Sequence, residues 1–580
     1  MVPGEALRGL AGVALFAGPG SGLAELLPAM RQLPPGRRLA YAYLLGVAWT
    51  AGWLYALSHW LAIPLRSPAI LSVAAIPTLA GAACGWHRRH RERRSALPSQ
   101  SPTTTAKLAA RLALIAGVAV TAAVFCDALT APLLDWDGRL IWSTQARYLR
   151  AEGSVDANVL EEGKWWITCP WYPLLMPIGQ VAVLEVTRAD VDHHAFRPMY
   201  AAFLPVWLLL VWGGARSYAG QEAAGWTTLA AALLSFPAFA GAGGATSAYS
   251  DLPLGCFVGG GALLLLGPRG SPSAGLAAGI LLAAGVLTKA EGEVLGPFAL
   301  LVAAVVPLLS TPGSKGRREI WRRRRTMLAL ASLPVAVAFT LLHSWRAGIA
   351  GGFESFTRLT SWPLLWPGIL TRLPRLAHDI GAEMLSYTDW GFFWWVAPFV
   401  VAAGWRGVRR RPARALLLLA GAPVAIGWLY ATIAVDPHFI VTTTWDRFLL
   451  QASMPLLMVF AMALRDLARR AAWPWRAGGR RSDPRLQLRG RRALDGGVEE
   501  LDHVQHRHPS ARALQAGGEL HQAAGVGGDH EVGAGREAVD HLPVAQLFGR
   551  LGLHQVVDAG RAAAEGGVGD LHQLQPGNGA

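Results

Sequence analysis

Runs of about 20 apolar residues recur along most of this chain, and each is long enough to cross the ~30 Å hydrocarbon core of a bilayer. This length criterion predicts about thirteen candidate spans. They lie near residues 8–30, 40–62, 67–85, 106–126, 199–216, 223–242, 251–267, 273–288, 291–310, 327–346, 390–405, 415–434 and 449–464. The first is the weakest, because GPGSG at Gly18–Gly22 interrupts it. The predicted fold is an all-α, polytopic transmembrane bundle of about 11–13 spans.

Composition excludes several classes of protein. A chain that is 52% hydrophobic and only 16% charged is not a soluble globular protein. Its net charge of +15 comes largely from short basic clusters between apolar spans, so it indicates topology and not a nucleic-acid partner. The four cysteines include no CxxC pair and have no histidine cluster beside them. Neither a disulfide framework nor a zinc site is expected.

The basic clusters predict the orientation of the chain. Under the positive-inside bias they should be cytoplasmic. They are His87–Arg94, Gly316–Arg325, Arg406–Arg414 and Arg465–Arg470. Counting spans from them places five polar segments on the outer face, at residues 135–198, 243–251, 288–293, 347–390 and 435–447. These segments hold most of the acidic residues of the membrane part, so function is expected there.

The composition changes beyond about Trp475 to a mixture of Gly, Ala, His, Asp and Val without helical or strand periodicity. Residues 1–475 are predicted to form the membrane domain, with residues 127–198 as its main catalytic loop. Residues 476–580 are predicted to be a disordered tail or the product of an unselected reading frame. The histidines of DHVQHRH, residues 502–508, are assigned no role.

The segment LLDWDGRLIWSTQARYL places Asp135 and Asp137 directly after an apolar span. Carboxylates two residues apart share a face only in extended backbone, so one of them is expected to point into a site. The following residues 141–149 have helical apolar spacing and predict an amphipathic helix that forms an outer cap. A carboxylate partly desolvated beside it can serve as a general base. The alternative is that the aspartate caps the helix.

Three other polar segments carry candidate residues. Lys289 and Glu291 lie between two apolar spans with almost no loop, where ionisable groups are costly, although a snorkelling lysine with a local ion pair is the alternative. Asp251 begins a span, where the helix dipole favours a carboxylate whatever its function. Arg447 lies at the mouth of a late span, where a guanidinium either binds phosphate or anchors the helix to lipid headgroups.

Five segments in this order resemble a known family. They are WDGRLIWSTQARYL, PWYPLLMPIG, AYSDLPLG, GVLTKAEGEVL and WDRFLLQASMPLL, within about residues 100–470. Together they resemble the GT-C glycosyltransferases, in particular the bacterial dolichyl-phosphate-mannose transferase-like proteins, which include the lipid A aminoarabinose transferases. The resemblance implies a multi-pass protein of the inner (cytoplasmic) membrane. It also implies inverting transfer of one sugar from a polyprenyl-phosphate carrier to a glycan, lipid or protein acceptor on the outer face.

The resemblance also implies roles for individual residues. The base would be Asp137, with Asp135 second, although the DWD spacing departs from the adjacent acids of the family. The donor phosphate would be bound by Lys289, Arg447 and Arg139, and the substrate oriented by Glu291, Asp251 and Tyr172. No metal ligand is assigned and a divalent metal is left open. Membrane lipids are expected partners and nucleic acid is not.

Two other classes of function compete with an enzyme. A secondary transporter predicts internal symmetry and charged residues near the middle of the bilayer. No repeat is evident, and the charges cluster at the predicted outer boundary. A non-catalytic envelope-assembly protein predicts that Asp137 is dispensable.

Overall fold

The described part of the chain is helical throughout. The computed structural model describes residues 3–89, 103–158, 169–189, 193–239, 243–267, 270–309, 311, 313–349, 362–433 and 437–471. All of them lie within one compact unit, Met1–Arg481, and none forms a β-strand. The all-α helical bundle is therefore confirmed. The predicted tail, residues 476–580, lies outside the described residues.

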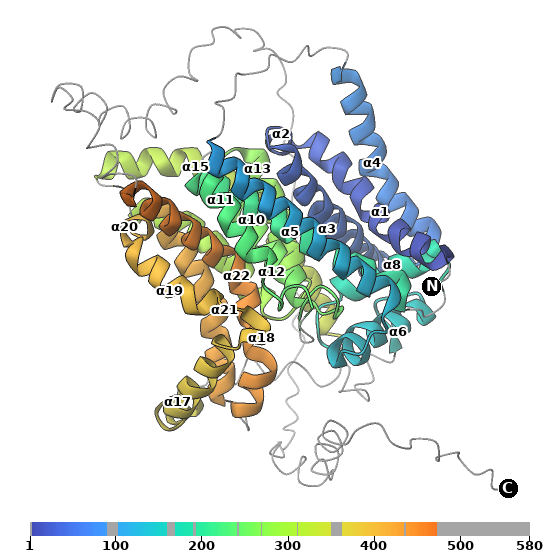
Figure 1. Ribbon diagram of the computed structural model, residues 1–580. Helices are drawn as coiled ribbons and strands as arrows, with labels where there is room; N and C mark the ends of the chain where they lie inside the picture. The colour runs from blue at the N-terminus through green and yellow to red at the C-terminus, as the bar shows by residue number, and fades with distance from the viewer. Residues whose placement is uncertain are drawn as a thin grey trace, which may run out of the picture. The chain divides into compact units, whose positions relative to one another are not determined.

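The helices follow one another with short connections (Figure 1). In the first half they are α1 (Pro3–Leu26), α2 (Pro28–Arg31), α3 (Pro35–Leu61), α4 (Ser67–Arg89), α5 (Thr104–Thr130), the π-helix η1 (Gly138–Ser143), α6 (Thr144–Glu152), α8 (Leu175–Thr187), α9 (His193–Ala201), α10 (Phe203–Ala219) and α11 (Gln221–Ala232). The second half comprises α12 (Asp251–Leu265), α13 (Pro272–Val286), α14 (Gly292–Leu309), α15 (Ser314–Arg346), α17 (Trp362–Met384), α18 (Tyr387–Trp390), α19 (Phe393–Ala403), α20 (Trp405–Val408), α21 (Arg411–Ile433) and α22 (Pro437–Ala471).

The apolar helices make this a multi-pass membrane protein. Among the described residues, 7 helices are long and apolar enough to cross a bilayer. They span residues 67–87, 104–130, 195–219, 292–309, 324–346, 412–432 and 437–471. Shorter apolar helices cover residues 175–187, 251–265, 272–286 and 393–403.

Several predicted boundaries differ from the structure. The predicted span 223–242 stops early, because α11 ends at Ala232 and turns follow it. The segment 437–447, expected in an outer loop, instead forms the first turns of the long helix α22. Its three consecutive threonines are compatible with a helix because two of them return their hydroxyls to backbone carbonyls one turn earlier.

The expected interruption of the first span is wrong. Helix α1 continues through Gly18–Gly22, and the small residues there allow close approach of its neighbours. A Cβ atom added at Gly20 would overlap the Ala42 carbonyl of α3, and one added at Gly22 would overlap the Pro77 carbonyl of α4. Membrane helices pack closely where small residues face each other, so these glycines serve the packing of α1 and do not break it.

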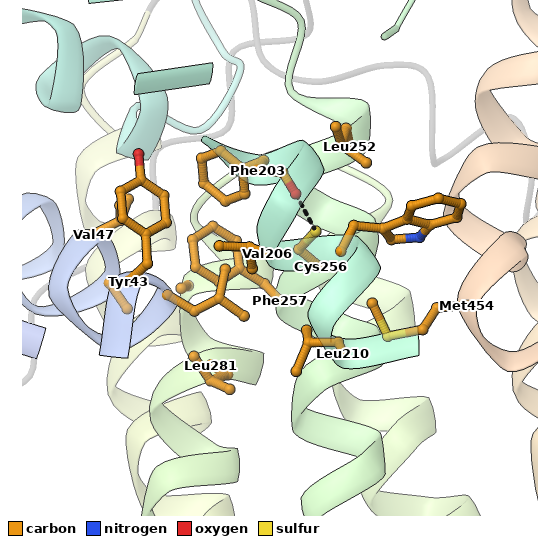
Figure 2. Close-up of a cluster of buried hydrophobic side chains, with 14 of the residues drawn as sticks. Tyr43, Val47, Phe203, Val206, Leu210, Leu252, Cys256, Phe257, Leu281 and Met454 are labelled. Carbon is orange, nitrogen blue, oxygen red and sulfur yellow. Dashed lines mark hydrogen bonds between the residues drawn. The ribbon is translucent and has the colours of Figure 1, made fainter. Parts of the chain in front are cut away.

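The core between α3, α10, α12 and α22 is filled by aromatic and aliphatic side chains (Figure 2). Phe203 packs edge-on against Tyr43 at 5.4 Å between ring centroids and against Phe257 at 5.7 Å. The Tyr43 hydroxyl donates to the Met199 carbonyl at 2.6 Å. This packing fixes the middle of the bundle and so fixes the ends of the helices that carry the polar residues.

Helices α6 and α18 lie at one end of this bundle, and α2 lies at the other (Figure 1). The amphipathic helix predicted after Asp137 is confirmed as η1 and α6. Its apolar side chains Ile141, Trp142 and Leu149 are buried, whereas Arg147 is exposed. The buried face packs on protein, mainly on α8. The cap thereby holds Asp137 against the end of the bundle.

Candidate functional site

Asp251 is the centre of a buried ion cluster. It is the first residue of α12, and its side chain is 0% exposed. Lys289 Nζ lies 2.7 Å from Oδ1, and Arg447 Nε lies 3.0 Å from Oδ2. The Gln451 amide also donates to Oδ1, at 2.9 Å. A carboxylate out of water requires such partners, because an unpaired buried charge costs several kcal/mol.

Arg447 connects this centre to the outer cap. Its NH1 lies 2.9 Å from Asp137 Oδ2, while its Nε binds Asp251. The guanidinium also lies over the ring of Tyr249, at 5.0 Å from the centroid. The Tyr249 hydroxyl in turn accepts a hydrogen bond from the Asp137 backbone N–H at 2.9 Å. One arginine on α22 therefore fixes both the side chain and the surroundings of Asp137.

Gly138 explains how the cap approaches so closely. A Cβ atom at this position would overlap the Ser247 carbonyl oxygen, so a glycine is required directly after Asp137. The segment that carries Ser247 and Tyr249 leads into α12 at Asp251. The glycine of the WDG sequence thus brings the first carboxylate to the second.

Lys289 and Glu291 lie in the tight turn between α13 and α14. Lys289 Nζ is 2.9 Å from Glu291 Oε1, and the Gly292 N–H donates to the Lys289 carbonyl at 2.9 Å. A Cβ atom at Gly292 would overlap the Gly285 carbonyl, so the chain can turn here only with glycine. The turn separates two acids: Glu291 faces Lys289, and Glu293 pairs with Arg346 at 2.8 Å.

The cluster carries a net negative charge. Asp137, Asp251 and Glu291 contribute −3, and Lys289 and Arg447 contribute +2, which leaves −1. Exposure divides the members into an inner and an outer group. The side chains of Asp251 and Lys289 are 0% and 3% exposed, whereas those of Arg447, Glu291 and Asp137 are 11%, 13% and 18% exposed. The last three form the edge that a ligand reaches first.

Three other candidate residues stand apart from these contacts. Asp135 lies nearer to Arg197, whose NH2 binds Asp127 at 2.7 Å, and burial raises the pKa of the Asp135 carboxyl against the opposing charge of Arg197. The Arg139 side chain is exposed and belongs to none of the ion pairs of the cluster. Tyr172 borders the cluster, with its ring 5.6 Å from that of Trp142, and burial raises its pKa.

Sequence reasoning missed three members of the site. Gln451 lies one helical turn after Arg447, and a polar residue at that spacing in an apolar helix was the available signal. Tyr249, next to the recognised Asp251, was also overlooked. Cys169 has a left-handed backbone (φ 48°), and its carbonyl accepts a hydrogen bond from Gln145 at 2.9 Å. Burial and the charge of Asp137 raise the pKa of the Cys169 thiol to about 12.

A second acidic group adjoins the cluster through α22. Among the described residues, Glu383, Asp389 and Asp446 place carboxylate oxygens within 4.8 Å of one another, close enough to share a metal ion. Protein contacts also satisfy these oxygens: Trp390 Nε1 donates to Asp446 at 2.6 Å, and Ser386 Oγ donates to Asp389 at 2.5 Å. Burial and the charge of Asp389 raise the pKa of Glu383, which favours a protonated carboxyl in this group.

Comparison of the chain with protein-family models, curated proteins and solved structures finds no match. The functional conclusion therefore depends on the geometry of the ion cluster.

Proposed function

We propose that the protein is an integral membrane glycosyltransferase of inverting type that uses a polyprenyl-phosphate sugar as donor. The observation that carries the proposal is the convergence of Lys289 and Arg447 on Asp251, with Arg447 also bound to Asp137. It supports a site in which two cations and one reachable carboxylate face the same small volume. The acceptor would be a glycan, lipid or protein at the outer face of the cytoplasmic membrane.

Each group has a defined part in the reaction. Asp137 takes the proton of the acceptor hydroxyl while the hydroxyl oxygen forms a bond to the anomeric carbon. The bond between that carbon and the phosphate oxygen breaks, and its electron pair goes to the lipid phosphate. Lys289 and Arg447 stabilise the charge that develops on this phosphate, and a single displacement inverts the anomeric centre. The apolar helices around the site provide a surface for the prenyl chain.

The chemistry assigns different roles to the two buried anions. Asp251 is fully enclosed and bound by three donors, so it positions the two cations and does not contact substrate. Glu291 is closer to the edge and can orient sugar hydroxyls. Asp135 lies outside the cluster, which favours Asp137 as the base.

Transfer of radiolabelled sugar from a panel of polyprenyl-phosphate sugars, in membranes that contain the protein, tests the proposal. Asp137→Asn should reduce transfer by about 10²–10⁴-fold, the usual contribution of a general base. Asp135→Asn, two residues away, is the matched control and should retain transfer within a few fold. No transfer by the correctly inserted wild-type protein from any donor would contradict the proposal and favour the transporter or assembly functions.

A further inference from the structure

Arg447 is already occupied by carboxylates in the structure. Its Nε binds Asp251, and its NH1 binds Asp137. A guanidinium binds a phosphate best through two parallel N–H donors, so an incoming phosphate competes with one of these carboxylates. The outcome of this competition decides how the site is loaded.

The two carboxylates differ in how easily they can leave. Asp251 is 0% exposed and is also held by Lys289 and Gln451, so its release would leave a buried charge without partners. Asp137 is 18% exposed, and its side chain has Arg447 as its ion-pair partner among the described residues. Its backbone is fixed by the Tyr249 hydroxyl, so the side chain can rotate while the main chain stays in place.

We propose that the Asp137–Arg447 ion pair is a latch that the donor phosphate opens by taking the place of Asp137 on Arg447. This inference rests on the proposed function and concerns the regulation of the same site. Before the donor binds, Asp137 is held by the guanidinium. After it binds, Asp137 is free to accept the proton of an acceptor hydroxyl. The latch therefore makes the donor bind before the acceptor can be activated.

Glu291 is not an equivalent latch. It lies two residues from Lys289 in the same tight turn, so its ion pair is re-formed locally whenever it breaks. Asp137 and Arg447 belong to distant segments of the chain, and no short turn holds them together. Glu291 thus provides a matched control: it is also a carboxylate bound to a cation of the cluster, at the same 2.9 Å distance.

Binding of farnesyl phosphate to the full-length protein in lipid nanodiscs tests the latch, with farnesol as the probe without phosphate. Removal of the competing carboxylate in Asp137→Asn should tighten farnesyl phosphate binding about fivefold, the size of one partly exposed ion pair. Asp137→Ala should act in the same direction. Glu291→Gln should change the affinity by less than twofold, and Arg447→Met should abolish the preference for farnesyl phosphate over farnesol.

The outcomes separate the latch from the proposed function. If the wild-type protein binds farnesyl phosphate and transfers sugar, but the Asp137 variants bind it equally or more weakly, the latch is wrong and the enzyme stands. If the wild-type protein neither prefers farnesyl phosphate over farnesol nor transfers sugar, both are wrong. Tighter binding by the Asp137 variants together with their loss of transfer supports both.

Discussion

Gly138 packs so closely on Ser247 that a single methyl group at Gly138 would overlap the Ser247 carbonyl oxygen. Because the obstacle is backbone, it cannot move aside as a flexible side chain would. This contact sets the distance between the outer cap and the segment that leads to Asp251, and Asp137 is the residue before it.

Gly138→Ala should therefore displace Asp137 from Arg447. We expect a loss of stability of about 1–3 kcal/mol, as for other overpacked sites, and a loss of transfer of at least tenfold. Thermal unfolding in detergent and the transfer assay measure the two effects. Gly52→Ala in α3 is the control, because a Cβ there meets nothing within 4 Å. It should be neutral or slightly stabilising. Equal behaviour of the two variants would contradict the packing argument.

Asp251 and Lys289 should be energetically coupled. Asp251→Asn leaves two buried cations without their shared anion, and we expect it to destabilise the protein by about 3–5 kcal/mol. Lys289→Met should also destabilise it, and the double variant should be more stable than the sum of the two changes implies. A double-mutant cycle on the free energy of unfolding measures this coupling. Additive effects would show that the 2.7 Å contact contributes little.

Asp135 should make the stability of the protein fall as pH rises through the acid range. Burial raises its folded-state pKa, so between the unfolded-state and folded-state values the folded protein binds more protons than the unfolded chain. Stability is lost across that window as pH increases. Asp135→Asn removes the titration, so this variant should gain stability relative to wild type on going from pH 3 to pH 7. Thermal unfolding across this range is the measurement, and a constant difference would contradict the assignment.

Cys169 should react slowly with alkylating reagents. With a pKa of about 12, roughly one thiol in ten thousand is ionised at pH 8, and the thiolate is the reactive form. In a chain with Cys84 and Cys126 replaced by Ser, the iodoacetamide rate should rise about tenfold per pH unit from pH 7 to 10. Asp137→Asn should speed the reaction, because the Asp137 charge raises this pKa. A rate that levels off near pH 9 would indicate an ordinary thiol.

The sequence predicted the class of the fold and five residues that the structure brings together: Asp137, Asp251, Lys289, Glu291 and Arg447. These residues were visible because charged groups among apolar spans are costly and therefore few. Their connectivity was not visible, because it depends on which helix ends meet. Asp135 and Asp137 illustrate the difficulty: their spacing indicated that they diverge, but only tertiary contacts with Tyr249 and Arg197 show which of them faces the cluster.

Span boundaries were predicted less well than the site, for a physical reason. Hydropathy records burial but does not distinguish lipid from protein as the apolar surroundings. Residues 437–447 are polar enough to resemble a loop, yet they continue α22 because their polar groups bond within the helix and to neighbouring segments. Gly18–Gly22 resembled a break, yet it is a surface on which α3 and α4 pack.

Helix α22 supplies two of the three donors to Asp251, and it is the last helix of the described chain. During synthesis, Asp251 and Lys289 therefore enter the membrane long before Arg447 and Gln451 are made. Until α22 arrives, the half-formed cluster lacks most of its compensating groups, and the nascent bundle cannot close around it. Completion of the active site and completion of the fold are thus one event in biogenesis, and a chain that stalls before α22 carries an exposed polar defect that membrane quality control can recognise.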